Sequence, residues 1–406
     1  MKIYRNLAEA IIKALQQIFL QNIKTDRLID QLFLSNKQWG SRDRRFLAKY
    51  IYESVRWYRL YYEVGIGHEP KNEAEWWKLL ATAFVLDGID LPDWPEFKGI
   101  DKEEILKRNT ELHTKRVVYC SIPDWLDELG LKEFGEKVWT ETIQSLNRPT
   151  KTVLRVNSLK TTRPKLLDQL KRLNIEAKTI GADLAIELEE QKNITQLQIY
   201  KDGLFEIQDY SSQQVVPFMN PESGAVIVDA CAGAGGKSLH LAAWMQNRGF
   251  IKAMDTEVYK LQELEKGAKR AGAQIITTQK LERNGQLPKS RLNVADYLLL
   301  DVPCSGTGVI RRNPDAKWKL NPKFIEDIIK LQRHILTEYS KMLKAGGKLL
   351  YATCSILPDE NERQIAWFLE ENEVGAEFTL IKSKRIMPQD EGFDGFYMAL
   401  LQKKSL

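Results

Sequence analysis

The segment AVIVDACAGAGGKSLHLAAWM, residues 225–245, joins a continuous apolar run, a glycine-rich turn and a second apolar stretch of helical length. An unbroken apolar run is typical of a strand buried on both faces, as in a parallel sheet. A second strand-like segment follows at residues 250–255 and ends in Asp255, and residues 297–301 and 348–353 read as two more buried strands. Strands that alternate with helices predict an α/β fold with a doubly wound parallel sheet. Ligands of such sheets bind beyond the carboxyl ends of the strands.

The glycine-rich turn is a candidate ligand loop, because glycine lets a ligand approach the backbone and the next helix presents its N–H groups. A Walker A phosphate loop is excluded, since Cys231 stands six residues before Lys237, where glycine is required. A dinucleotide fingerprint starting at Gly233 is weakened, because its third glycine position is Ser238. An adenosine site remains, in which Asp255 accepts hydrogen bonds from ribose hydroxyls, and S-adenosylmethionine fits this pattern. A purely structural turn is the alternative.

Two cysteines follow two later strands of the expected sheet. Cys304 lies in DVPCSG and Cys354 in TCS, so we expect both thiols in one crevice. A thiolate that attacks C6 of a pyrimidine ring makes C5 nucleophilic enough to take a methyl group, and a second group must then assist release. Asp301 is placed to bond the N3/N4 edge of cytosine, and Lys237 is a candidate for raising the thiolate share. A packing role for both cysteines is the alternative.

The remaining chain predicts three domains. Residues 1–145 show apolar positions at helical spacing, residues 146–205 read as a small α/β unit, and residues 206–406 hold the expected sheet. No window approaches 18 consecutive apolar residues, so we expect neither a membrane span nor secretion. Four cysteines without metal-ligand spacing indicate a reducing, cytoplasmic setting and no metal site.

The amino-terminal part is basic. Residues 1–63 carry 12 Lys/Arg against 6 Asp/Glu. Six of these cations lie close together: Arg42, Arg44, Arg45, Lys49, Arg56 and Arg59. We interpret them as a stripe that faces phosphates, with Arg42 and Arg45 as RNA-binding residues. A solvated helix face is the alternative.

Several motifs together resemble the RsmB/Nop/Sun family of S-adenosylmethionine-dependent RNA (cytosine-5) methyltransferases, and most closely its bacterial 16S rRNA type. They are DACAGAGGKS, LLLDVPCSGTGVIRRNPDAKW, GGKLLYATCSILPDENE, EIQDYSSQ and MPQDEGFDGFYMALL. The resemblance implies a Rossmann-like class I methyltransferase domain that binds S-adenosylmethionine. It also implies an RRM-like unit before that domain and an all-helical NusB-like RNA-binding domain at the amino terminus.

By this resemblance Cys354 is the nucleophile, Cys304 assists release of the product, and Lys237 and Asp301 complete the catalytic set. The cofactor-binding residues implied are Cys231, Ala232, Gly233, Ala234, Gly235, Gly236, Lys237, Asp255 and Asp301. Those implied to face RNA are Arg311, Arg312, Lys317 and Trp318.

The chain departs from the family pattern in two places. Gly233-Ala234 replaces the family's Ala-Pro in the glycine loop. The carboxylate expected after the third strand is missing, and Thr277, Thr278 or Gln279 would have to replace it.

The leading hypothesis is a monomeric RNA cytosine-5 methyltransferase acting on rRNA. A tRNA substrate is an alternative within the same chemistry. A DNA cytosine methyltransferase would use the Pro-Cys cysteine as nucleophile and leave Cys354 without a role. A ribosome-assembly factor that binds RNA without turnover is the alternative outside enzymes, and the missing third-strand carboxylate favours it.

Overall fold

The computed structural model describes residues 3–181, 184–190, 192–282 and 289–405. The chain divides into two compact units. One comprises Met1–Arg148 and Ile310–Pro322, and the other comprises Pro149–Val309 and Lys323–Leu406. Within the described ranges, no helix is both long and apolar enough to cross a lipid bilayer.

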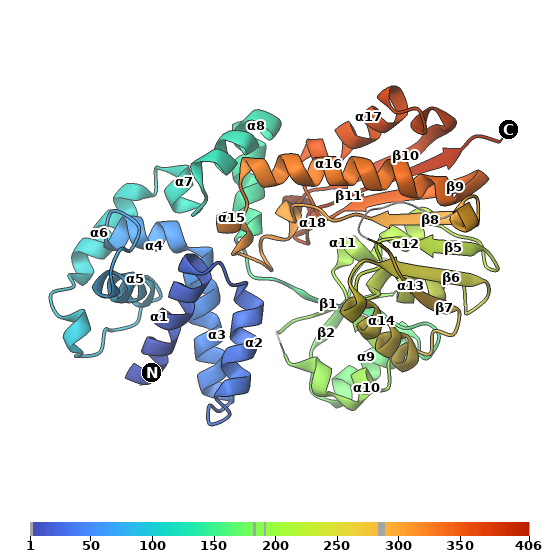
Figure 1. The fold of residues 1–406 in the computed structure, drawn as a ribbon. Helices are drawn as coiled ribbons and strands as arrows, with labels where there is room; N and C mark the ends of the chain where they lie inside the picture. The colour runs from blue at the N-terminus through green and yellow to red at the C-terminus, as the bar shows by residue number, and fades with distance from the viewer. Residues whose placement is uncertain (1–2, 182–183, 191, 283–288, 406) are drawn as a thin grey trace. The chain divides into compact units, whose positions relative to one another are not determined.

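The first unit is helical, as the apolar spacing predicted (Figure 1). Its helices are α1 (Arg5–Leu20), α2 (Thr25–Ser35), α3 (Ser41–Arg56), α4 (Tyr58–Gly65), α5 (Glu73–Leu86), α6 (Lys102–Leu112), α7 (Arg116–Tyr119), α8 (Asp124–Leu146) and, from the second chain segment, α15 (Ala316–Lys319). The apolar faces of α1, α3 and α5 form one buried cluster with Leu15, Leu47 and Leu80 at its centre. Burial of these faces holds the unit together, since most helical stability in proteins comes from packing.

The segment 310–322 corrects our prediction that Arg311 and Lys317 face RNA, because both side chains are buried inside the helical unit. The Lys317 ammonium donates to the carbonyl oxygen of Arg56 at 2.6 Å and to Asn147 Oδ1 at 3.1 Å. Arg311 Nη2 donates to Ser145 Oγ at 3.1 Å. Burial lowers the pKa of Lys317 well below its usual range. These two cations therefore satisfy buried oxygen atoms and present no charge to a ligand.

Trp318 is also a packing residue in this structure. Its indole N–H donates to the carbonyl oxygen of Val55 at 2.7 Å, and its ring meets Tyr58 edge-on at a centroid distance of 5.5 Å. Arg312, in contrast, keeps part of its surface exposed. Arg311, Lys317 and Trp318 suggested an RNA-binding surface in the sequence. In the structure they instead pack segment 310–322 among the helices of the first unit.

The amino-terminal basic stripe is shorter than predicted. Arg56 is buried and donates to the carbonyl oxygen of Arg311 at 3.0 Å. Arg59 donates to the carbonyl oxygen of Ile122 and to Asp124 Oδ1, both at 2.8 Å. Two neighbours from the stripe, Arg42 and Arg45, lie exposed on α3.

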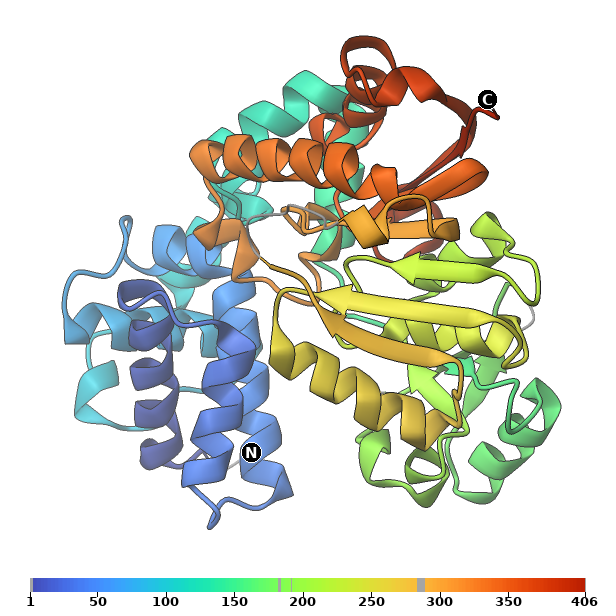
Figure 2. The ribbon, with the colours of Figure 1, turned by 45° about the vertical axis from the view of Figure 1, so that its right-hand side comes forward.

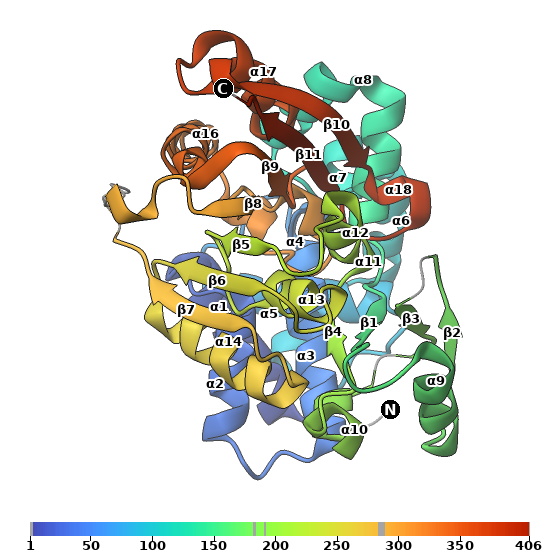
Figure 3. The ribbon, with the colours of Figure 1, turned by 90° about the vertical axis from the view of Figure 1, so that its right-hand side faces the viewer.

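The second unit begins with a small antiparallel sheet, the α/β unit expected after residue 145 (Figure 3). Its strands are β1 (Thr152–Val156), β2 (Ala177–Thr179), β3 (Ala185–Leu188) and β4 (Phe205–Ile207), in the order β2-β3-β1-β4. Helices α9 (Arg163–Arg172) and α10 (Gln198–Lys201) connect them in a βαββαβ sequence. Leu154, Leu166, Leu170 and Phe205 share the apolar cluster between α9 and the strands.

The larger sheet has seven strands in the order β10-β11-β9-β8-β5-β6-β7. These are β5 (Val226–Asp229), β6 (Phe250–Asp255), β7 (Ile276–Lys280), β8 (Ala295–Asp301), β9 (Leu343–Thr353), β10 (Phe378–Ile386) and β11 (Phe396–Lys403). Strands β5 to β9 pair in parallel, and Figure 2 shows β5 and β6 side by side with the same direction. Strand β11 runs antiparallel to both of its neighbours. The predicted doubly wound sheet is confirmed, with one antiparallel strand at its carboxy-terminal side.

Helices cover both faces of this sheet (Figure 1). The cluster on one face includes side chains from α12 (Val215–Met219), α13 (Gly236–Trp244) and α14 (Val258–Ala271). The cluster on the other face includes side chains from α16 (Pro322–Tyr339) and α17 (Glu362–Glu371). Two short helices, α11 (Tyr210–Gln213) and α18 (Pro388–Glu391), complete the unit. Since strands buried on both faces cannot expose polar side chains there, the chemistry of this unit falls at the strand ends.

Candidate active site

The glycine loop after β5 has the geometry of a ligand cradle. Gly233 and Gly235 have φ values of +55° and +93°, which glycine adopts without strain. A Cβ atom at Gly235 would lie 2.5 Å from Leu264 Cγ, whereas a Cβ atom at Gly233 would meet no atom within 4 Å. Gly235 therefore allows α14 to pack against the loop, and the open space above Gly233 fits a ligand lying on the backbone.

Asp255, at the end of β6, holds this loop. Its Oδ2 accepts the Gly233 N–H at 2.9 Å, and its Oδ1 accepts the Glu257 N–H at the same distance. Lys260 lies 3.8 Å from Oδ1. A carboxylate has about four lone-pair positions, so Asp255 retains acceptor capacity for ribose hydroxyls. The loop and this carboxylate are therefore compatible with the adenosine part of S-adenosylmethionine.

Arg155 supports the same loop and was missed by our sequence analysis. Its guanidinium is buried on β1, and Nη1 donates to the carbonyl oxygen of Gly236 at 2.6 Å. Burial lowers the pKa of Arg155 to about 10. Arg155 belongs to no motif that the sequence analysis used, and its support of the glycine loop is seen only in its contact with Gly236 at the start of α13.

Lys237 and Asp301 form an ion pair between the glycine loop and the end of β8. Lys237 Nζ donates to Asp301 Oδ2 at 2.5 Å, and the ammonium also lies 5.4 Å from the centre of the Phe396 ring. The Asp301 side chain remains 30% exposed, so one face of this carboxylate is open to a ligand. Lys237 thus contacts the Asp301 carboxylate and not a cysteine. Its predicted role in raising the thiolate share of a cysteine therefore remains a hypothesis.

The structure brings Cys304 and Cys354 together, as expected from their places after β8 and β9. Their Sγ atoms lie 3.2 Å apart, and both residues are partly exposed. The hydrogen bond to Cys354 and burial raise the pKa of the Cys304 thiol well above its usual range. Cys304 therefore retains its proton near neutral pH and can donate in this sulfur–sulfur hydrogen bond, in which either sulfur can be the donor.

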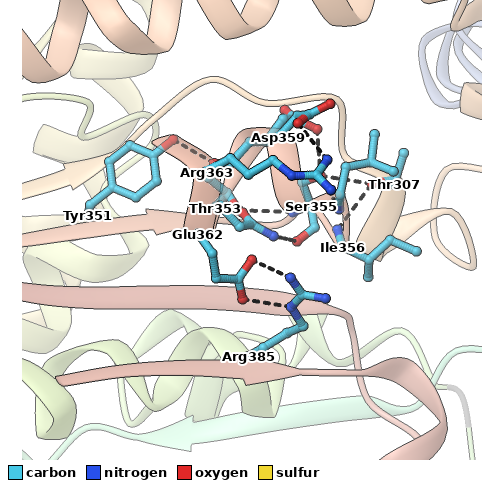
Figure 4. Close-up of polar contacts among 12 residues, drawn as sticks. Thr307, Tyr351, Thr353, Ser355, Ile356, Asp359, Glu362, Arg363 and Arg385 are labelled. Carbon is cyan, nitrogen blue, oxygen red and sulfur yellow. Dashed lines mark hydrogen bonds and ion pairs between the residues drawn. The ribbon is translucent and has the colours of Figure 1, made fainter. Parts of the chain in front are cut away.

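The loops that carry the two cysteines are joined by buried polar groups (Figure 4). Thr307 Oγ1 lies 2.9 Å from Ser355 Oγ and accepts the Ile356 N–H at 3.2 Å. The Gly308 N–H donates to the carbonyl oxygen of Cys354 at 3.0 Å. A buried carboxylate, Glu360, accepts hydrogen bonds from a serine of each loop. Our sequence analysis missed it, although the run PDENE directly after TCSIL placed several polar side chains beside the cysteine loop.

Strand β7 carries no carboxylate, as the sequence indicated. Thr277 Oγ1 donates to the carbonyl oxygen of Ile251, and Thr278 donates to Glu265 on α14. Both hydroxyls are thus used within the fold. The strand ends at Lys280, level with Asp255, and the exposed Glu282 follows two residues later. Glu282 offers a carboxylate near the expected position that our sequence analysis did not consider.

Asp229, the last residue of β5, is a buried acid just before the glycine loop. Ser238 Oγ donates to its Oδ2 at 2.6 Å. Burial raises the pKa of Asp229 to about 7. The folded chain therefore holds a proton here between about pH 4 and pH 7, where an unfolded aspartate has lost its proton.

We predict that this proton makes stability depend on pH. As pH rises from 5 to 8, the free energy of unfolding of the wild type should fall by about 2 kcal/mol relative to Asp229→Asn, because asparagine cannot ionise. Thermal unfolding of both proteins across this range measures the difference. Two curves that stay parallel from pH 5 to pH 8 would contradict a raised pKa at Asp229.

Comparison with known families gives two matches along the chain. Residues 216–402 match the family model described as 16S rRNA methyltransferase RsmB/F. Residues 122–195 match a ferredoxin-like domain of RsmF/B-like methyltransferases. The second match agrees with the strand order of the small sheet.

Curated relatives extend the similarity to the whole chain. A probable ribosomal RNA small subunit methyltransferase B from Synechocystis sp. PCC 6803 is 31% identical over 98% of this chain and 99% of its own length. A probable enzyme of the same name from Bacillus subtilis is 32% identical over 79% of this chain and 73% of its own length.

Solved structures share the fold. A protein named PH0851 superposes with a TM-score of 0.82 at 24% identity, over 99% of this chain and all of its own. NSun6 from Pyrococcus horikoshii, solved with SFG, has a TM-score of 0.63 at 20% identity, over 69% of this chain and 98% of its own. At these identities the likeness concerns the fold alone.

Proposed function

Because the chain belongs to the RsmB/F family of 16S rRNA methyltransferases, we propose that it forms 5-methylcytosine in 16S rRNA through a covalent cysteine adduct. The observation that carries this proposal is the pair of sulfur atoms 3.2 Å apart at the carboxyl edge of the sheet. Methyl transfer alone does not require thiols. Two thiols at this edge match a reaction in which one attacks the ring and the other assists its departure.

The donor that fits the glycine loop is S-adenosylmethionine, which supplies an electrophilic methyl group when bound. Gly233 and Asp255 would hold its adenosine part, with Cys231 to Gly236 as the surrounding loop. Lys237 pairs with Asp301 by direct contact. Asp301 would accept a hydrogen bond from the cytosine 4-amino group and, once N3 is protonated as the thiolate adds, a second one from N3–H. Uracil presents a different donor and acceptor pattern at this edge, so Asp301 favours cytosine.

The two cysteines divide the covalent steps between them. Cys354 would lose its proton to solvent and attack C6 as a thiolate. The C5=C6 electron pair would then take the methyl group at C5 with release of S-adenosylhomocysteine, and the C5 proton would later pass to a solvent base. Loss of that proton re-forms C5=C6 and expels the Cys354 sulfur as a thiolate. Cys304, a protonated thiol within hydrogen-bond distance, donates to that departing sulfur. A donor at a developing thiolate lowers the barrier to release.

We assign the three parts of the chain to separate tasks. The helical domain 1–145 and the RRM-like domain 146–205 would bind RNA, and domain 206–406 would carry out methyl transfer. The exposed cations Arg42 and Arg45 on α3 are the RNA-binding residues that we propose in the first of these. A 16S rRNA substrate is favoured over tRNA because the relative that spans 98% of this chain is named as a small-subunit rRNA enzyme.

The cysteine roles are tested by replacing each thiol. With undermodified 16S rRNA and methyl-labelled S-adenosylmethionine, we predict that Cys304→Ala accumulates a labelled protein–RNA adduct on a denaturing gel, because release lacks its donor. Cys354→Ala should give neither adduct nor methylated RNA. Turnover of each variant should fall by at least about 100-fold, the usual range for loss of a catalytic acid–base or nucleophilic group.

Wild-type protein with tRNA in place of rRNA is the matched control for substrate. An adduct that requires Cys304 would reverse the two roles. Labelling of tRNA but not rRNA would replace the proposed substrate, and cofactor binding without label on either RNA would favour a non-catalytic assembly factor.

The RNA-binding role of α3 is tested by reversing two exposed charges. We predict that Arg42→Glu with Arg45→Glu weakens RNA binding and reduces the slope of log Kd against log salt by about one to two, because each lost phosphate contact removes about 0.7–0.9. Cofactor affinity should not change. The control reverses two exposed lysines on α8, Lys132→Glu with Lys137→Glu, and should leave RNA affinity within about twofold. If both pairs of substitutions weakened RNA binding equally, the exposed cations of α3 would be an ordinary solvated helix face and not an RNA-binding site.

A further inference from the structure

Glu360 is a fully buried acid. Its side chain is 0% exposed, and within the described part of the chain no Lys, Arg or His lies within ion-pair distance of its carboxylate. Four neutral donors surround it. Oε2 accepts the Ser305 N–H at 2.8 Å and Gln332 Nε2 at 2.9 Å, while Oε1 accepts the hydroxyls of Ser305 and Ser355. Desolvating a carboxylate is expensive, so a buried acid bonded this completely has a specific task.

Its partners are the residues directly after the two cysteines. Ser305 follows Cys304 and Ser355 follows Cys354, and both hydroxyls donate to the same oxygen atom, Oε1. One carboxylate oxygen therefore links the two loops, in addition to the direct bonds that Thr307 and Gly308 make between them. The cysteines themselves do not contact Glu360 by any hydrogen bond recorded among the described residues.

Two further contacts make this position of Glu360 rigid. Gln332 on α16 donates both to Glu360 and to the carbonyl oxygen of Pro303, so the residue before Cys304 is fixed as well. The Tyr351 hydroxyl donates to the main-chain carbonyl oxygen of Glu360 at 2.8 Å. Bonds from α16, β9 and both loops thus meet at one buried residue.

We propose that Glu360 is a positioning residue that holds the Cys304 and Cys354 thiols at the separation the reaction needs. The contribution of Glu360 to catalysis rests on the function proposed above, but its effect on the distance between the two thiols does not. Geometry of this kind matters because a misplacement of about 1 Å at a reacting centre can cost about 100-fold in rate. The negative charge of Glu360 is also among the causes that keep Cys304 protonated.

The substitution Glu360→Gln preserves shape and breaks this arrangement. A glutamine has one acceptor oxygen, and its amide group would face either two serine hydroxyls or the Ser305 N–H and the Gln332 amide. In the second arrangement two N–H donors lose their acceptor, and in the first both serine hydroxyls must turn and accept from the amide. Either arrangement replaces bonds to a charged acceptor by weaker neutral ones, so the two loops should be held less closely. Ser355→Ala is a milder second variant, because it keeps the carboxylate and removes a single hydroxyl bond.

The matched control is Glu362→Gln, two residues further on. Glu362 is bonded through both oxygens to Arg385 on β10 (Figure 4). Among the described residues it makes no hydrogen bond or ion pair to either cysteine loop. It is the same chemical change in the same segment, and it also removes a charge. Any general loss of folding from a glutamine in this segment should therefore appear in the control.

The experiment measures the thiol pair directly with phenylarsine oxide, a trivalent arsenical that binds two neighbouring thiols. The arsenic atom forms two As–S bonds, both S–H bonds break, and the arsenical oxygen leaves as water. Mass spectrometry and titration give stoichiometry and Kd without RNA or cofactor. We expect one arsenical per wild-type chain, removed by either single cysteine-to-alanine variant, since the sulfur atoms lie 3.2 Å apart.

Glu360→Gln should raise that Kd at least tenfold, Ser355→Ala should raise it by less, and Glu362→Gln should change it by less than twofold. The kcat of Glu360→Gln for rRNA should fall at least tenfold with the KM for S-adenosylmethionine unchanged. An arsenical Kd that Glu360→Gln and Glu362→Gln change equally would overturn the positioning role. A tight thiol pair in an enzyme that methylates no RNA would instead overturn the proposed function and leave the positioning role intact.

Discussion

The parallel pairing of β5, β8 and β9 is the constraint on which the rest of the site depends. In this pairing Asp229 is level with Leu299, and Asp301 is level with Ala352. The chain that leaves β8 and the chain that leaves β9 therefore start from the same edge of the sheet. Cys304 and Cys354 come three and two residues after that level, close enough for their sulfur atoms to meet. A shift of the β8–β9 register by two residues, about 6 to 7 Å along the strand, would separate them.

The carboxylates at this edge of the sheet differ in the groups that they bind. Asp255 accepts hydrogen bonds from backbone N–H groups and fixes the glycine loop, and Asp301 forms an ion pair with the Lys237 ammonium. The donors that the described residues offer to Asp229 and Glu360 are hydroxyl and amide groups. Such buried acids stabilise a fold weakly, because desolvation offsets most of what their hydrogen bonds contribute. Their presence behind the glycine loop and the cysteine loops is explained better by the positions that they impose on those loops.

Much of this could be predicted from the sequence. The apolar runs 225–230, 297–301 and 348–353 and the glycine turn sufficed for the sheet, because buried parallel strands have a distinctive pattern. The meeting of Cys304 and Cys354 followed from the rule that strand ends share an edge. The two boundaries between the three domains and the RNA-binding role of Arg42 remain predictions.

What could not be predicted depended on tertiary burial. Lys317 and Arg311 looked like RNA ligands because cations are usually exposed, and nothing local in the sequence shows that segment 310–322 packs among helices. Glu360 was overlooked for the converse reason, since an acid in a polar run gives no sign of complete burial. Both errors concern charged side chains in the interior, where the partners decide the role.

The central claim is that Cys354 is the thiol that attacks the base, and RNA containing 5-fluorocytidine tests it most directly. Fluorine at C5 cannot leave as a proton does, so the wild-type enzyme should stop at the covalent adduct after methyl transfer. Digestion with trypsin and mass spectrometry then identify the attached residue. We predict a fluorinated, methylated cytidine on the peptide LLYATCSILPDENER, which contains Cys354. The same nucleotide on the peptide that contains Cys304 would contradict the assignment.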